Sequence, residues 1–296
     1  MIESSVRQRV EALVGPVATA TPVSGGCIAT ALHVEAGDTS YFLKFGSGRA
    51  GATFHAESLG LDALRGSASG EIFVPAVYGA AENSEGTEFG FILMDWIEQG
   101  EKNNAFWQKF GQGLAAMHAS ESPTYGFGSH NFIGSLPQIN TWEGDWSVFF
   151  RDHRLAPQIE RARRSGMWLA DWDAIALPLI EGISDMLPPV PQCSLVHGDL
   201  WSGNVLAHRD GLPVLIDPAV YYGDREVDVA MTELFGRFPE AFYAAYRDRS
   251  PLSADYDKRK TIYNLYHLIN HLNHFGSGYA SQVGAMLRAV RSSFGF

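Results

Sequence analysis

The sequence is short of cysteines, of basic residues and of long apolar runs, and each shortage excludes a class of protein. Its two cysteines, Cys27 and Cys193, form no CxxC pair, so we expect no disulfide framework and a reducing, cytoplasmic setting. Its 22 lysines and arginines against 33 acidic residues give a formal charge of −11. That balance disfavours nucleic acid or an anionic membrane as a partner, because both need a basic face. No apolar run approaches the roughly 20 residues of a membrane span, and residues 1–15 resemble an amphipathic helix rather than a signal peptide.

What remains is the composition of a globular chain with a sizeable core. Of 296 residues, 46% are hydrophobic and 19% charged, so we expect one large domain or two lobes, without disorder. Residues 29–46 predict a β-hairpin that turns at Asp38–Thr39. Residues 49–66 have helical spacing with Gly66 as the stop, and residues 90–95 form an apolar strand.

From Asn103 onward the pattern is mainly helical. The exceptions are a loop at residues 122–141 and short strands near 193–197, 204–208 and 213–217. Residues Trp142, Trp146, Phe149 and Phe150 have the spacing of a helix that faces the core. The sequence therefore predicts an α+β fold with an N-terminal sheet lobe carrying one main helix, residues 1–97. A larger, mostly helical lobe, residues 98–296, is expected to follow it.

The stretch LVHGDLWSGNVL, residues 195–206, places unusual polar groups between two apolar ends. Asn204 follows Asp199 by five residues, and Asp217 follows Asn204 by thirteen, so all three are expected at the ends of two neighbouring short strands. Such a set suits phosphoryl transfer, in which one carboxylate orients the attacking hydroxyl while the amide and the other carboxylate hold Mg²⁺. A plain turn is the alternative, since Asp and Asn are common in turns. Asp217 after an apolar strand favours the functional interpretation, because an unused buried acid is costly.

Lys44 lies in a strand between Leu43 and Phe45 and needs a partner there. Glu57 on the next predicted helix could pair with it, in the arrangement that positions ATP phosphates, although the helix could instead expose Glu57. Each of these signals is weak alone, but their order along the chain favours a kinase.

The motifs SGGCI, LPQIN, DWSVFF, LVHGDLWSGNV, IDPAVYYGDRE, FYAAY and NHLNHFGSGY resemble those of the fructosamine kinase (ketosamine-3-kinase) family, from about Ser24 to Tyr279. HGDLWSGN alone is similar to the wider aminoglycoside-phosphotransferase group. The resemblance implies a protein-kinase-like two-lobed fold. It also implies ATP-dependent phosphorylation of the sugar 3-hydroxyl of a ketosamine, on a small amine or a glycated protein. The 3-phosphate is expected to be unstable and to release the amine.

The resemblance also implies roles for single residues. Asp199 is expected to be the catalytic base, Asn204 and Asp217 the Mg²⁺ ligands, Lys44 the phosphate-contacting lysine and Glu57 its orienting partner. Backbone groups of Asp95 and Ile97 are expected to meet adenine, with Trp96 as a packing residue. The nucleotide loop is expected at Gly25 and Gly26, where the full G-x-G-x-x-G spacing is missing, so backbone N–H groups would grip the phosphates. Pro218 follows Asp217 and argues against a swinging segment there, because proline fixes φ.

Other residues have competing interpretations. Trp201 is expected to contact the sugar or the lysine stem, with loop packing as the alternative. The histidines at 267, 271 and 274 share a helix face and could bind a metal, but packed histidines are the simpler interpretation, with His271 as a candidate contact for substrate hydroxyls. Asp228 is expected to brace the catalytic loop, and His197 to tie it to the strand after Asp217. Asp145 is a weak candidate for the substrate amine.

Cys27 stands directly after Gly25 and Gly26. It is either a small buried residue or a redox-sensitive thiol that could link two copies into a covalent homodimer. Three other functions stay open: a small-molecule kinase of the aminoglycoside or choline type, a non-catalytic nucleotide-binding scaffold, and a metal-storing module built on the histidines.

Overall fold

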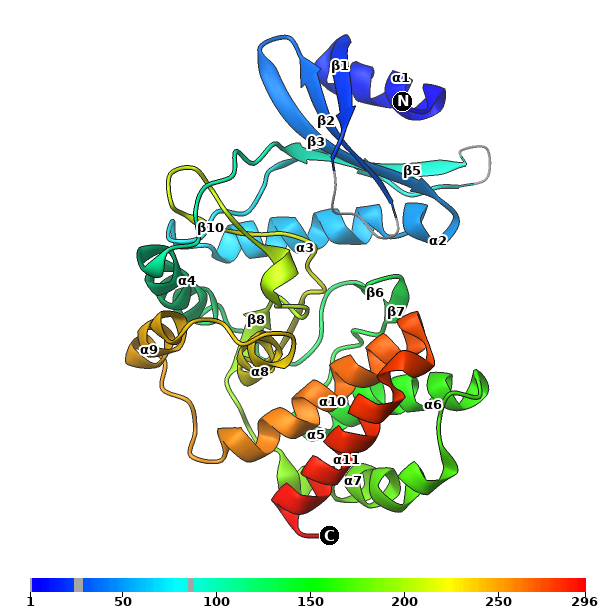
Figure 1. The fold of residues 1–296 in the computed structure, drawn as a ribbon, viewed down its shortest axis with the longest axis vertical. Helices are drawn as coiled ribbons and strands as arrows, with labels where there is room; N and C mark the ends of the chain where they lie inside the picture. Colours follow the sequence, from blue (N-terminus) through cyan, green and yellow to red (C-terminus); the bar gives the residue numbers. More distant parts are fainter. Residues whose placement is uncertain (1, 24–28, 85–87) are drawn as a thin grey trace.

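The computed structural model describes residues 2–23, 29–84 and 88–296, so Gly25, Gly26 and Cys27 lie outside the described residues. Its N-terminal lobe is built on a five-stranded antiparallel sheet with the order β1-β2-β3-β5-β4 (Figure 1). The strands are β1 (Val17–Pro22), β2 (Thr30–Ala36), β3 (Thr39–Ser47), β4 (Val77–Ala81) and β5 (Phe89–Asp95). The predicted hairpin is confirmed, but Thr39 belongs to β3 and pairs with Ala36.

Helices cover the two faces of this sheet. Helix α1 (Ser4–Val14) buries Val6 and Val10 against the alternating apolar residues of β2 and β3. On the other face lie the one-turn α2 (Gly48–Gly51) and the main helix α3 (Phe54–Ser67). The prediction that Gly66 stops this helix is wrong, because α3 runs through Gly66 to Ser67.

The C-terminal lobe is mostly helical, as expected (Figure 1). Its helices are α4 (Asn104–Met117), α5 (Trp146–Phe150), a π-helical turn (Arg151–Leu155), α6 (Ala156–Arg164), α7 (Asp173–Met186), α8 (Glu226–Leu234), α9 (Glu240–Arg249), α10 (Tyr256–Phe275) and α11 (Ala280–Phe294). Its strands form three antiparallel pairs: β6 (Asn131–Ile133) with β7 (Leu136–Gln138), β8 (Cys193–Val196) with β11 (Tyr221–Asp224), and β9 (Val205–Ala207) with β10 (Pro213–Leu215). None of the helices in the described ranges is long and apolar enough to cross a bilayer.

Two details depart from the sequence prediction. The loop at 122–141 contains the β6–β7 hairpin, whose three-residue strands are too short to leave a periodic pattern. Trp142 is 47% exposed rather than core, whereas Trp146, Phe149 and Phe150 are buried as expected. Asp145 caps α5 by accepting from the Val148 N–H through its Oδ1, and its contact with a substrate amine stays a prediction.

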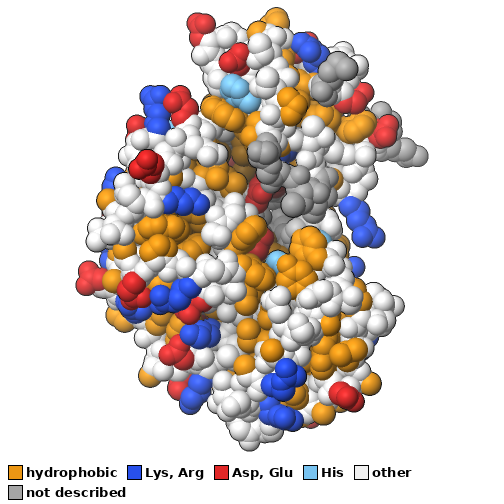
Figure 2. Space-filling model, viewed as in Figure 1, with side chains coloured by type: hydrophobic (Ala, Val, Ile, Leu, Met, Phe, Trp, Pro, Cys, Tyr) orange, Lys and Arg blue, Asp and Glu red, His pale blue; other side chains and the backbone are white. Residues whose placement is uncertain are grey.

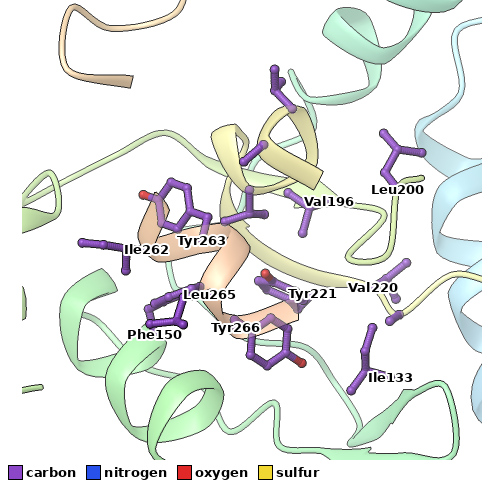
Figure 3. Close-up of a cluster of buried hydrophobic side chains, with 14 of the residues drawn as sticks. Ile133, Phe150, Val196, Leu200, Val220, Tyr221, Ile262, Tyr263, Leu265 and Tyr266 are labelled. Atoms are coloured by element: carbon purple, nitrogen blue, oxygen red, sulfur yellow. The ribbon is translucent and has the colours of Figure 1, made fainter. Parts of the chain in front are cut away.

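One large apolar cluster joins the lobes. It contains residues of α3, such as Leu61 and Leu64, together with residues of α4, α5, α8 and α10. Figure 3 shows part of it, where Val196, Leu200 and Val220 beside the loop after β8 and Tyr263 and Tyr266 of α10 project into the same region. The segment after α3 also reaches across the boundary: the Phe73 N–H donates to the Pro213 carbonyl at 2.8 Å, and the Leu215 N–H donates to the Phe73 carbonyl at 3.1 Å.

Candidate active site

The loop between β8 and β9 carries Asp199 and is fixed at its base by backbone geometry. Gly198 has φ +81°, and a Cβ built there would lie 2.1 Å from the Ala219 carbonyl oxygen, so a glycine is needed. Asp228 of α8 accepts from the N–H groups of His197 at 2.7 Å and Gly198 at 2.9 Å. The predicted bracing role of Asp228 is confirmed.

Asp228 is in turn supported by His118, which follows α4 and is fully buried. The His118 Nε2 lies 3.2 Å from the Asp228 carboxylate, and its Nδ1 lies 2.8 Å from the Tyr246 hydroxyl. Burial raises the pKa of Asp228, but the hydrogen bonds from His118 and the loop N–H groups outweigh it and lower that pKa overall. His118 was not singled out from the sequence, where its only signal is a lone histidine at the end of an apolar helix.

Asn204 holds the carboxylate of Asp199. Its Nδ2 donates to the Asp199 carbonyl at 2.8 Å and to the Asp199 Oδ2 at 3.2 Å, so the Asn204 Oδ1 is left as an oxygen ligand for a cation. Burial, together with the charge of Asp217, raises the pKa of Asp199 to about 7, although the Asn204 hydrogen bond lowers it. A carboxylate with a raised pKa is a better proton acceptor near neutral pH.

Asp217 follows β10 with φ 53°, and among the described residues it is the only non-glycine residue with a positive φ. Asp tolerates this left-handed conformation better than most residues, and such strained positions cluster at functional sites. His197 helps to set the conformation, because its Nε2–H donates to the Ile216 carbonyl at 3.0 Å while its Nδ1 accepts from the Asp199 N–H at 3.3 Å. The His197 side chain thus reaches the residue before Asp217, while its backbone carbonyl accepts from the Ala219 N–H, so His197 ties the loop to the chain that follows Asp217 and leads into β11, as predicted.

The segment after Asp217 is held from two sides. From one side, the Ala219 N–H donates to the His197 carbonyl at 2.8 Å. From the other, the buried side chains of Asn131 and Gln138 donate to the carbonyls of Val220 at 2.8 Å and Ala219 at 3.0 Å. Both belong to the β6–β7 hairpin, and neither was singled out from the sequence. The hairpin therefore fixes the chain just beyond Asp217.

Lys44 of β3 reaches across the lobes to Asp217. Its Nζ lies 2.6 Å from the Asp217 Oδ1 and 2.9 Å from the Glu57 Oε1, so the predicted Lys44–Glu57 pair forms. Burial raises the pKa of Glu57 to about 7 despite the nearby lysine. Burial also acts to raise the pKa of Asp217, but Lys44 outweighs it and holds that pKa below its usual range. One ammonium group thus serves two carboxylates, and the closer one, Asp217, stays ionised.

Figure 2 shows acidic side chains inside the hollow between the lobes. This excess of negative charge favours a bound cation. The Asp217 carboxylate, 47% exposed, and the Asn204 Oδ1 are the hard oxygen donors that Mg²⁺ prefers, so these residues fit the ion in chemical type.

The segment joining the lobes is built for packing and for backbone contacts. Trp96 packs on His33 with ring centroids 4.1 Å apart, as predicted. The Asp95 N–H is engaged by the Ala76 carbonyl at 3.0 Å, whereas the Ile97 N–H has no partner among the described residues. Lys102 was not singled out from the sequence; its Nζ donates to the Ser202 carbonyl at 3.3 Å and ties this segment to the catalytic loop.

Two aromatic or heteroaromatic side chains are candidates for acceptor contact. Trp201 is 38% exposed, and its indole lies over Gly203, where an added Cβ would be 2.4 Å from the ring. His271 is half-buried among Phe235, Phe275 and Tyr279. Its Nδ1–H donates to the His267 carbonyl at 2.8 Å, which leaves Nε2 to accept a hydrogen bond.

The histidines of α10 do not form a metal centre. His267 is buried and burial lowers its pKa to about 3, while His274 points to the Ile133 carbonyl with its Nε2 at 2.9 Å. Within the described residues, no group of three or more His, Cys, Asp or Glu side chains could hold a metal. The metal-storing alternative therefore has no structural support.

Comparison with known proteins gives a consistent result. Residues 2–293 match the family model described as fructosamine kinase. The chain is 42% identical over 267 residues to a probable ketoamine kinase of Synechocystis sp., covering 90% of this chain and 88% of that one. It is 38% identical over 274 residues to the chloroplastic protein-ribulosamine 3-kinase of Arabidopsis thaliana, covering 90% and 80%.

Solved structures agree on the fold. A candidate fructosamine-3-kinase from Thermobifida fusca is 30% identical and superposes with a TM-score of 0.87, covering 98% of this chain and 99% of that one. The aminoglycoside phosphotransferase APH(4)-Ia in complex with AMP-PNP and hygromycin B is 18% identical with a TM-score of 0.65, covering 98% of each chain, and shares the kinase-like fold alone. The chain thus has a protein-kinase-like two-lobed α+β fold and belongs to the fructosamine kinase family.

Proposed function

We propose that this protein transfers the γ-phosphate of ATP to a sugar hydroxyl, O3, of a ketosamine carried by a lysine or another amine. The observation that carries the proposal is the convergence of Lys44, Asp199, Asn204 and Asp217 from separate segments on one point between the lobes. Ketoamine and ribulosamine are the substrates in the names of its relatives, which supports the choice of acceptor. We propose residues 1–97 as the nucleotide-binding lobe and residues 98–296 as the catalytic lobe.

In this mechanism each residue has a limited task. The Asp199 carboxylate, oriented by Asn204, accepts the proton of the attacking hydroxyl, and its raised pKa favours that transfer. Lys44 holds phosphate oxygens while Glu57 keeps its ammonium group in place. Mg²⁺, held by Asp217 and Asn204, would neutralise phosphate charge when bound. Adenine would meet the backbone at Asp95 and Ile97, and Gly25 and Gly26 would contact the phosphates.

A panel of acceptors tests the proposal. With Mg·ATP, we expect ADP release to depend on fructose-lysine or ribulose-lysine, and a phosphorylated sugar product to appear by mass spectrometry. Kanamycin and choline should give only background ADP release, because the acceptor site is proposed to fit a sugar–amine adduct. Turnover with kanamycin or choline and none with either ketosamine would instead favour the small-molecule kinase alternative.

Trp201 is proposed as a wall of the acceptor site. We expect Trp201→Ala to raise KM for the ketosamine by about tenfold, because a lost aromatic wall costs roughly 1–3 kcal/mol. KM for ATP should stay near the wild-type value. Steady-state kinetics with each substrate varied in turn checks this, and Trp201→Phe should recover part of the loss. A change confined to ATP would place Trp201 outside the acceptor site.

The proposed setting is cytoplasmic, and a redox-linked homodimer through Cys27 stays a prediction. Cys193 is a poor disulfide partner, because it is buried, its Sγ donates to the Thr124 carbonyl at 3.2 Å, and burial raises its pKa to about 12. Non-reducing gel mobility after mild peroxide should reveal a dimer in the wild type but not in Cys27→Ala. If the wild-type protein stays monomeric after peroxide, Cys27 is only a packing residue.

A further inference from the structure

A small cavity lies between the lobes, and none of the proposed catalytic or metal-binding residues lines it. Its volume is about 180 Å³, which is below the several hundred Å³ of a site for a whole small molecule and fits a single side chain or functional group. It is lined by Arg49, Ala52, Phe132, Ser135, Leu136, Pro137 and Arg161. The cavity thus combines an apolar floor with a guanidinium group from each lobe.

The two arginines have no acidic partner among the residues that the structure describes. Many other arginines pair with acids, as Arg209 does with Glu98 at 2.6 Å and Arg249 with Glu71 at 2.7 Å, and others, such as Arg154 and Arg225, donate to backbone carbonyls. The side chains of Arg49 and Arg161 make no ion pair or hydrogen bond within the described ranges, and no acidic residue among those described lines the cavity. In a chain with a formal charge of −11, this is a local concentration of unneutralised positive charge. Paired guanidinium groups are well suited to a carboxylate.

The position of the cavity favours the acceptor over the nucleotide. One wall is the tip of the β6–β7 hairpin, whose Asn131 and Gln138 hold the backbone just after Asp217. Another wall is α2, which directly follows the strand that carries Lys44. Figure 1 shows α2, β6, β7 and α6 on the side of the molecule opposite the segment that joins β5 to α4. Adenine is proposed to meet that segment, so the cavity lies on the side of the molecule away from the proposed adenine contact.

We propose that this cavity is an acceptor subsite that binds a carboxylate attached to the ketosamine substrate, above all the side chain of a glutamate close to a glycated lysine. The apolar floor would take the methylene stem, and Arg49 and Arg161 would bind the carboxylate from opposite lobes. This inference rests on the proposed function and extends it by naming the kind of polypeptide that is preferred. Because the two arginines belong to different lobes, an acidic acceptor would also bridge them.

The experiment compares acceptors that differ only in a carboxylate. Peptides with one fructosamine-lysine flanked by Glu or by Gln, and free fructose-lysine against its amide, are assayed at saturating Mg·ATP. We expect the carboxylate form to have a kcat/KM roughly tenfold higher, as charge-assisted pairs to two arginines allow. A preference for Glu over Gln in the peptides would show that the bound carboxylate is a glutamate side chain of the polypeptide. A preference for free fructose-lysine over its amide would show that it is the α-carboxylate of the glycated lysine.

Variants test whether the cavity causes the preference for acceptors that carry a carboxylate. Arg49→Gln and Arg161→Gln should each reduce the preference while leaving KM for ATP and turnover of the neutral acceptor unchanged. Arg291→Gln is the matched control, because Arg291 is an exposed arginine in the last turn of α11. Equal rates for carboxylate and neutral acceptors in the wild type, or equal losses on both in the variants, would overturn the subsite while leaving the proposed function standing. Turnover of no ketosamine at all would overturn both.

Discussion

Asp199→Asn is expected to lower kcat by about 10²–10⁴-fold while the protein stays folded and still binds ATP. The asparagine can keep the hydrogen bond from the Asn204 Nδ2, but it cannot accept the proton of the attacking hydroxyl. The wild-type rate should also fall at acid pH, because the base must be unprotonated, and the variant should lack this acid limb. Stopped-time assays across pH, with calorimetric titration of Mg·ATP, measure both effects.

Asp210→Asn provides the control for this change. Asp210 is an acid in the β9–β10 turn whose side chain is 68% exposed, so its loss removes the same charge without touching the site. We expect its kcat to match the wild type. A near-wild-type kcat for Asp199→Asn would show that Asp199 is not the catalytic base, even if the variant binds Mg·ATP normally.

The second large effect is expected at Asp217. Asp217→Ala should lose the Mg²⁺-dependent part of ATP binding, at least about tenfold in affinity, because the ion loses its carboxylate ligand. Alanine also fits poorly at φ 53°, so Asp217→Asn is the necessary companion: it removes the charge but tolerates the left-handed backbone. Calorimetric titration of ATP with and without Mg²⁺ should show the loss in both variants.

His274→Gln is the control for the metal assignment, since glutamine can still donate to the Ile133 carbonyl. Its Mg²⁺-dependent ATP affinity should equal that of the wild type. If this histidine variant lost the Mg²⁺ effect and both Asp217 variants kept it, the ligands would have to be sought on α10. Thermal unfolding of each variant shows whether it is folded before its affinity is compared.

The polar residues of the site could be predicted because each conflicts with its local sequence. Lys44 interrupts an apolar strand and Asp217 ends one, and neither pattern is stable without a use or a partner. Their partners in the structure are each other, a contact between residues 173 positions apart. No local pattern encodes that contact, and it was not predicted; the partner predicted for Lys44 was Glu57, which it also contacts.

The strand arrangement around Asp199 was predicted less well. Asp199, Asn204 and Asp217 were expected at the ends of two neighbouring strands. Asn204 and Asp217 do lie at the ends of the paired strands β9 and β10, but Asp199 follows β8, which pairs with β11. The strand β11, which pairs with β8, was not predicted. Its four residues are too few to show a clear alternation of apolar and polar side chains. Long-range supports such as His118 and Gln138 were missed for a similar reason: a buried polar side chain is recognisable only once its distant acceptor is known.

The apolar cluster shared by the lobes limits how the enzyme can move. Leu61 and Leu64 of α3 are fully buried in it, and burying each is worth roughly 1.5–3 kcal/mol. Lifting α3 away would also break the backbone bonds of Phe73 with Pro213 and Leu215. A swing of the whole N-terminal lobe is therefore costly. Ile92 and Met94 of β5 are buried in the same cluster, so the sheet is held to α3 and the paired Lys44 and Glu57 would move as one unit.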